Sequence, residues 1–226
     1  MSEIHGASAS GVGDPYDAWI DLARNKPGQA VRARALEVKQ QAPVRVFLGR
    51  LLGVHNSERA WRVGADGEEK VARRLRKLPA GWHVLHSVPV GDKGSDIDHV
   101  IVGPGGVFTV NTKNHSRSKV WVSQNSFLVN GHKTDHLRNS RHEAQRATRL
   151  LSVACSFTVN VTPIIVVMAS AMKVKAQPEG VEVVRHRHIA RWLAQRPNML
   201  SPRDVERIFD VARRDTTWTS RGTYLP

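Results

Sequence analysis

The chain has 226 residues, 40% of them hydrophobic and 24% charged, which suits one globular core with room for an extension. Its formal net charge of +14 favours a polyanionic partner, either nucleic acid or an anionic membrane surface. The single cysteine excludes an internal disulfide framework and a cysteine-based zinc site. No apolar run approaches the ~20 residues of a membrane span, and the start of the chain lacks the layout of a signal peptide, so we expect a cytoplasmic protein.

Composition divides the chain into four segments. Residues 1–28 are rich in Gly, Ser, Ala and Asp without a sustained period, which predicts a mostly disordered tail. Residues 29–60 carry apolar side chains at helical spacing with arginines and lysines between them, which indicates a basic helical extension. This basic arm either contacts nucleic acid or anionic lipid, or is only the solvated face of an appended helix. Residues 61–215 are predicted to form the core domain, and residues 216–226 a C-terminal tail.

The core domain is predicted to open with a helix that begins near Gly64-Ala65-Asp66-Gly67-Glu68 and ends at Pro79. Glu68 is expected in its first turn, where a carboxylate suits the positive end of the helix dipole. Strands are then expected from runs of β-branched and aromatic residues separated by turns such as Gly103-Pro104-Gly105-Gly106. These runs are residues 82–90, 97–103, 107–112, 119–122, 127–129, 162–168 and 181–184.

A further helix is predicted over about residues 136–156, with an apolar side and a basic side. The basic side is suited to hold a phosphate backbone. The residues expected to make that contact are Arg138, Arg141, Gln145 and Arg149. Helices over 189–194 and 202–214, the second with Ser201 as its N-cap, complete the domain. This order of elements predicts an α/β fold in which a mixed central sheet is flanked by helices on each side.

The first predicted hairpin carries side chains that suit a metal site. Mg²⁺ and Mn²⁺ prefer oxygen ligands, usually one or two carboxylates, and retain several waters. Asp98 is the natural candidate, and Glu68 is expected to arrive from the helix. Asn111 and Lys113 are two residues apart on one strand, so their side chains project from the same face. A lysine there can orient an attacking water or offset charge on the phosphate.

Three motifs stand in a specific order and spacing. They are Gly64-x-x-Gly67-Glu68, Asp96-Ile97-Asp98-His99-Val100-Ile101-Val102 and Gly106-Val107-Phe108-x-x-Asn111-Thr112-Lys113-Asn114. Together they resemble the NERD (nuclease-related) domain, a family similar to the PD-(D/E)xK nuclease superfamily. The resemblance covers about residues 61–168 and implies a restriction-endonuclease-like core. It implies that Asp98 binds the metal, that Lys113 is the catalytic lysine and that Glu68 is the helix carboxylate. Gln145 resembles the helix glutamine that some superfamily members use.

Position 111 departs from that pattern, because the superfamily has Glu or Asp where this chain has Asn111. An amide oxygen can bind a hard cation but brings no negative charge. At an effective dielectric of about 20, a unit charge ~4 Å from a dication is worth several kcal/mol before desolvation is subtracted. Superfamily members are known to relocate this acid to a neighbouring helix, so we expect Glu143 to act as a metal ligand. Glu69 and Asp96 are the other candidates, and the alternative is a weakened or inactive site.

The sequence therefore predicts a nuclease that depends on Mg²⁺ or Mn²⁺ and hydrolyses phosphodiester bonds in DNA. Its metal affinity is expected to be low unless a carboxylate replaces the charge that is missing at Asn111. The rival interpretation is a non-catalytic nucleic-acid-binding module of the same fold, in which Asn111 marks the loss of the metal. A third interpretation is an adaptor that uses the basic arm at a membrane surface.

Overall fold

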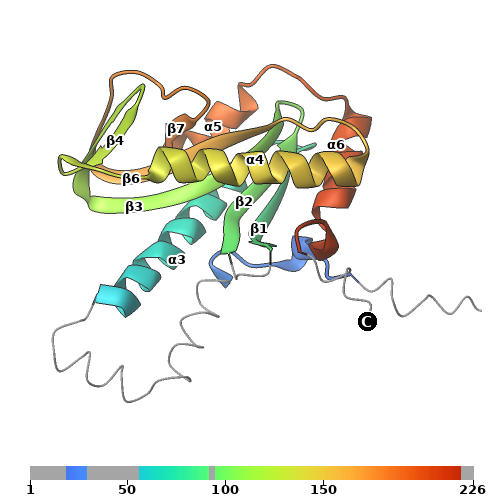
Figure 1. Cartoon of the computed structure of the whole chain (residues 1–226), viewed down its shortest axis with the longest axis horizontal. Coiled ribbons are helices and arrows are strands. Elements are labelled where there is room, and N and C mark those ends of the chain that lie inside the picture. Colours follow the sequence, from blue (N-terminus) through green and yellow to red (C-terminus); the bar gives the residue numbers. More distant parts are fainter. Residues whose placement is uncertain (1–18, 30–55, 92–94, 220–226) are drawn as a thin grey trace, which may run out of the picture.

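The computed structural model describes residues 19–29, 56–91 and 95–219 of the chain (Figure 1). The predicted basic arm lies outside the described residues from 30 to 55, and the predicted disordered tail lies outside them from 1 to 18. What is described is a sheet with helices packed against it. The predicted α/β class is therefore confirmed.

A mixed seven-stranded sheet forms the centre of the described fold. Its strands are β1 (His83–Val90), β2 (Ser95–Gly103), β3 (Gly106–Ser123), β4 (Ser126–Val129), β5 (His132–Lys133), β6 (Val161–Val174) and β7 (Glu182–Arg185). β1, β2 and β3 form an antiparallel meander. β6 pairs in parallel with β3, and β7 pairs in parallel with β6. The β4–β5 hairpin continues the sheet beside the second half of β3.

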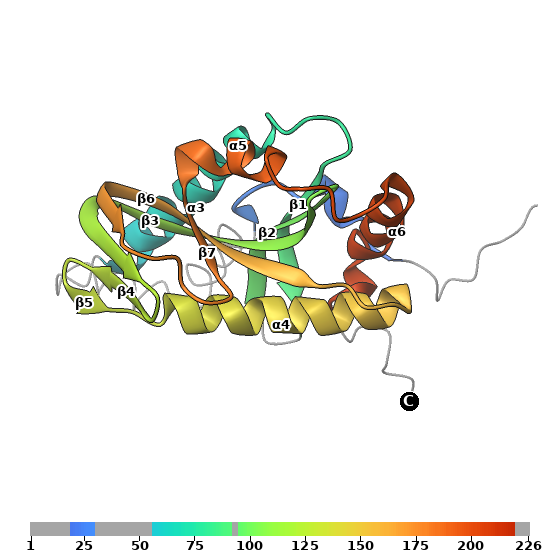
Figure 2. The same cartoon turned by 90° about the horizontal axis from the view of Figure 1, so that it is seen from above.

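Helices cover both faces of this sheet (Figure 2). α4 (His136–Cys155) lies along one face, whereas α3 (Asn56–Leu75) and the short α5 (Ile189–Ala194) lie on the other. α6 (Pro202–Ala212) packs against α4, and Ser201 caps it by accepting the backbone N–H of Asp204, as predicted. No helix among the described residues has both the length and the apolarity needed to cross a membrane.

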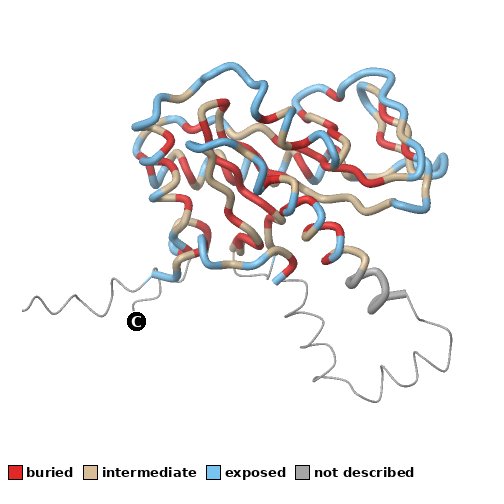
Figure 3. Tube along the Cα trace, turned by 180° about the vertical axis from the view of Figure 1, so that it is seen from behind, coloured by how far each residue is buried: buried red, intermediate tan, exposed pale blue. Residues whose placement is uncertain are grey.

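Buried residues are concentrated in the middle of the fold (Figure 3). The interior of β6 joins the apolar layers on the two faces of the sheet. All four residues of 164–167 are at most 1% exposed. Ile164 lies in the same apolar cluster as Leu75 of α3, whereas Ile165 lies in the same cluster as Leu137 of α4. A continuous apolar run is typical of a strand that is covered on both faces, so the sequence predicted this strand correctly.

α3 begins earlier than predicted, and this changes the place of Glu68. The helix already starts at Asn56 and runs through Gly67, so Glu68 lies in its interior and not in its first turn. Gly67 packs closely there, because a Cβ would lie 3.0 Å from Met168 Cε and 3.1 Å from Asn114 Cβ on the sheet, and these side chains would have to shift to admit it. This glycine therefore marks close packing of a helix on a sheet, which composition alone does not distinguish from a helix start.

Residues 19–29, which we call the strap, pack against the domain, so the predicted tail over 1–28 is wrong in its last part. Leu22 is 2% exposed. The Arg213 guanidinium donates hydrogen bonds to the Asp21 carboxylate and thereby holds the pKa of Asp21 below its ordinary value. The apolar residues of the strap are too few to form a period, which is why composition concealed them.

The C-terminal boundary at residue 215 is also wrong by a few residues. Trp218 is 1% exposed, and its indole N–H donates to the carbonyl of Ala212 at 2.7 Å. The carbonyl of Trp218 in turn accepts the backbone N–H of Gly91 at 2.9 Å. Trp218 therefore belongs to the core, and the predicted tail over 216–226 lies outside the described residues only from 220 onwards.

Trp218→Ala should lower the free energy of unfolding by about 3–5 kcal/mol, because it removes a buried aromatic side chain and its hydrogen bond. Urea unfolding followed by circular dichroism measures this change. Met199→Ala is the matched control, since Met199 is 71% exposed and its truncation should change stability by less than about 0.5 kcal/mol. Equal stability of both variants would show that Trp218 lies outside the cooperative core.

Candidate active site

Asp98 lies where β2 and β3 part. The register between the two strands ends at the pair of His99 and Val110. At the residue before His99, the Asp98 carboxylate accepts the backbone N–H of Thr112 at 2.5 Å. The Asp98 carboxylate thus accepts a backbone N–H of β3 that β2 no longer pairs with. This hydrogen bond holds the Asp98 side chain between the two strands.

Asn111 and Lys113 follow on β3, and Asn111 faces α4. The Asn111 amide nitrogen donates to Glu143 Oε2 of α4 at 3.2 Å. Side chains two residues apart on a strand share one face, so Lys113 projects from the same side of the sheet as Asn111. The charges of Asp98 and Lys113 both act on Glu143. The structure therefore brings four of the predicted site residues together on the face that α4 covers.

Two half-buried carboxyl side chains, those of Asp98 and Glu143, dominate the electrostatics of this site. Burial, and next the negative charge of Asp98, raise the pKa of Glu143 to about 8. Burial also raises the pKa of Asp98 to about 6, although the N–H of Thr112 and the charge of Lys113 work in the opposite direction. Glu143 Oε1 is buried and has no hydrogen-bond partner among the described residues. A cation between the two groups would relieve both penalties.

Glu68 is buried, and its described contact is with the strap. Its carboxylate accepts the backbone N–H of Gly28 at 3.0 Å, and α3 covers the sheet face opposite α4. The charges that raise the pKa of Glu143 are those of Asp98 and Asp96. The role of Glu68 as a metal ligand stays a prediction.

The predicted nucleic-acid-binding residues all lie on α4, and two of them already have partners. Arg138 pairs with the aspartate three residues before it at 3.2 Å. Arg141 donates two hydrogen bonds to the backbone carbonyl of Glu179. Gln145 and Arg149 are exposed. Their contact with nucleic acid stays a prediction.

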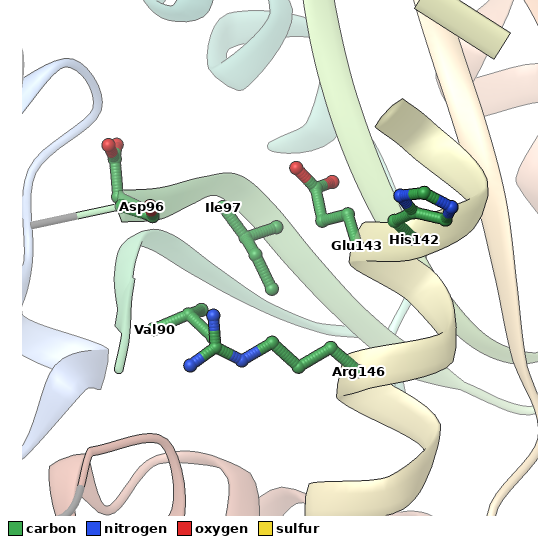
Figure 4. A pocket seen from close by; sticks show the side chains of 7 residues that line it. Val90, Asp96, Ile97, His142, Glu143 and Arg146 are labelled. Atoms are coloured by element: carbon green, nitrogen blue, oxygen red, sulfur yellow. The ribbon is translucent and has the colours of Figure 1, made fainter. Parts of the chain in front are cut away.

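A pocket of about 190 Å³ opens beside Glu143, between α4 and the adjoining ends of β1 and β2 (Figure 4). Its lining includes Val90, Asp96, Ile97, His142, Glu143 and Arg146. Of these residues, Arg146 was not predicted from the sequence to lie at the site. Spacing could have indicated Arg146, because residues three apart on a helix are neighbours on its surface.

The donor set suits a hard divalent cation. In the described part of the chain, no group of three or more His, Cys, Asp or Glu side chains could hold a metal ion. Two carboxylates and one amide oxygen remain, from Asp98, Glu143 and Asn111, and Mg²⁺ commonly takes one or two carboxylates and keeps several waters. The unpartnered Glu143 Oε1 fits such an ion. Of the other candidates, Asp96 acts electrostatically on this site, whereas Glu69 lies on α3.

Comparison with known proteins identifies the domain that contains this site. Residues 63–168, just under half of the chain, match the nuclease-related domain (NERD). The resemblance that the three motifs indicated is thereby confirmed. An uncharacterised protein of Bacillus anthracis is 45% identical over 56 residues, which are 23% of this chain and 26% of that protein. The matched stretch thus spans about a quarter of that relative's length. No solved structure matches the chain.

Glu143→Gln should remove a pH-dependent loss of stability. The pKa of Glu143 is about 8 in the folded state and about 4.5 without the fold, so the unfolded chain binds fewer protons between these values. The free energy of unfolding of the wild type therefore falls as pH rises from about 5 to about 8, by a few kcal/mol at ~1.4 kcal/mol per unit. Glu143→Gln should lack most of this fall, so its free energy of unfolding should increase relative to that of the wild type as pH rises from about 5 to about 8.

Urea unfolding in metal-free buffer from pH 5 to 8.5 measures the difference. Glu179→Gln, at an exposed glutamate, is the matched control and should follow the wild type. Because the pKa of Asp98 is also raised, the free energy of unfolding of Glu143→Gln should still fall as pH rises, but by less than in the wild type. Parallel curves for the wild type and Glu143→Gln would show that Glu143 is not buried as described.

Proposed function

We propose that this chain, given the match of its residues 63–168 to the nuclease-related domain, is a nuclease that uses Mg²⁺ or Mn²⁺ to hydrolyse phosphodiester bonds in DNA. The observation that carries the proposal is the contact between Glu143 and Asn111. Through it a helix carboxylate reaches the strand position that lacks a negative charge. The site then has two carboxylates, Asp98 and Glu143, and proteins commonly bind Mg²⁺ through one or two carboxylates.

The residues of the site have separate roles in this proposal. Asp98 and Glu143 would hold the cation together with the amide oxygen of Asn111. The bound ion supplies a Lewis acid and lowers the pKa of a coordinated water. Lys113 would stabilise the negative charge that develops on the phosphate oxygens. Because β2, β3 and α4 are tightly packed elements, these groups are positioned before the substrate arrives.

The charge of the protein supports a nucleic-acid substrate. A formal net charge of +14 attracts a polyanion, and the exposed Arg149 on α4 is available to a phosphate backbone. Such contacts are electrostatic, so the affinity for DNA should fall as the salt concentration rises. The substrate class in this proposal therefore rests on charge, and the reaction type rests on the carboxylate pair.

A non-catalytic nucleic-acid-binding module is the second candidate, and Asn111 is the observation that favours it. In the described residues the metal would depend on two carboxylates and one amide, because no group of three ionisable ligands is present. Both candidates bind DNA. They differ in whether a divalent cation leads to cleavage.

Exchanging the carboxylate and the amide between positions 111 and 143 tests the nuclease directly. Glu143→Gln should slow the nicking of supercoiled plasmid in millimolar Mn²⁺ by about 100-fold or more, since it removes one of two charged ligands. The double variant Glu143→Gln with Asn111→Asp returns a carboxylate to the strand and should recover at least about 10-fold of that loss. Asp98→Ala sets the inactive limit.

The same assay separates the two candidates. Glu179→Gln serves as the control for removing a negative charge elsewhere on the surface. A wild type that binds plasmid but never nicks it, in either Mg²⁺ or Mn²⁺, would establish the non-catalytic module. Full activity of Glu143→Gln would show that Glu143 is not a ligand, even if the chain is a nuclease.

A further inference from the structure

The pocket beside Glu143 contains an arginine that the proposed reaction does not use. Arg146 lies one helical turn after Glu143, and its side chain extends across the pocket toward Val90 (Figure 4). Its guanidinium lies over the backbone of Gly91, because a Cβ at that position would overlap Arg146 Nη2. Gly91 also has a φ of +67°, which favours glycine. The end of β1 thus leaves room for this guanidinium.

Arg146 forms no hydrogen bond or ion pair with any described residue, although Asp96 and Glu143 line the same pocket. On the other side of the pocket, Glu143 Oε1 is buried and has no described hydrogen-bond partner. A cationic group and an unpartnered carboxyl oxygen therefore border one cavity without contacting each other. A phosphate in the cavity can accept hydrogen bonds from the guanidinium, while a metal ion held by the carboxylate would bind the next phosphate along the strand.

We infer that this pocket binds a phosphate group of the DNA strand adjacent to the cleaved phosphodiester, with Arg146 as the positioning residue. The inference rests on the proposed function and adds a subsite to it. A guanidinium can grip two phosphate oxygens at once, which fixes the direction of the strand as well as its place. The residues that line the pocket include no Phe, Tyr or Trp on which a base could stack, so the pocket suits the backbone of the strand.

The position of the two residues on α4 agrees with this assignment. Residues three apart on an α-helix are neighbours on its surface, and Glu143 and Arg146 line the same pocket. The long side chain of Arg146 reaches away from Glu143 toward Val90, so the two residues can serve different phosphates of one strand (Figure 4).

Substitution of Arg146 tests the subsite in the full-length protein. The affinity for a fluorescein-labelled DNA duplex is measured by fluorescence anisotropy in EDTA over a range of salt concentrations. Plasmid nicking in Mn²⁺ is measured over a range of DNA concentrations. Arg146→Ala should raise Kd and KM by about 10-fold and lower the salt slope by about one. Arg146→Lys should keep the salt slope but recover only part of the affinity, because an ammonium cannot bind bidentately.

Two arginines serve as controls for charge. Arg191 is exposed on α5, on the other face of the sheet, and Arg149 is exposed on α4 but does not line the pocket. Arg191→Ala should weaken binding least, and Arg149→Ala should weaken it less than Arg146→Ala. Equal losses in all three would mean that only net charge matters, which overturns the subsite but leaves the nuclease intact. A wild type that binds without nicking overturns the nuclease, while a specific loss at Arg146 would still support the phosphate subsite.

Discussion

The repulsion between two half-buried carboxyl groups, Asp98 on the sheet and Glu143 on α4, is the constraint on which this site depends. Asp98 is tied to β3 through the N–H of Thr112, and Glu143 stands on a helix whose Ala147 and Leu151 are fully buried. Neither group can withdraw without breaking a backbone contact or opening the core. Burial raises the pKa of both carboxyl groups, so the fold holds unfavourable electrostatic energy at this point. The low dielectric responsible for that penalty also strengthens the field that any bound cation would feel.

The contact between Asn111 and Glu143 suits an amide, and not a third acid, at position 111. An acid at position 111 would add a third like charge beside Asp98 and Glu143, and one of the three would have to be protonated. The amide instead donates a hydrogen bond to the helix carboxylate. The amide at position 111 and the carboxyl group at position 143 are therefore directly coupled, and a change at either residue should alter the pKa of Glu143.

The sequence predicts the sheet well because its information is local there. The apolar run at 162–168 and the β-branched runs around the Gly103–Gly106 turn define strands by themselves. The contact of Glu143 with Asn111 places this glutamate beside the predicted site, and its role as a metal ligand stays a prediction. The errors concern contacts between distant segments. Gly67 packs against the sheet, and the strap packs against the C-terminal segment, and no local pattern encodes either contact.

The strap also constrains the order in which the fold can assemble. Asp21 contacts a partner 192 positions later in the chain, so this pair cannot form during synthesis until Arg213 has been made. Closing so long a segment is also slow compared with forming hairpins and helices. The sheet, α4 and the pair of Asp98 and Glu143 use segments that are complete earlier. The contact of Gly28 with Glu68 joins residues only 40 positions apart, so this end of the strap can find its place well before Asp21 does.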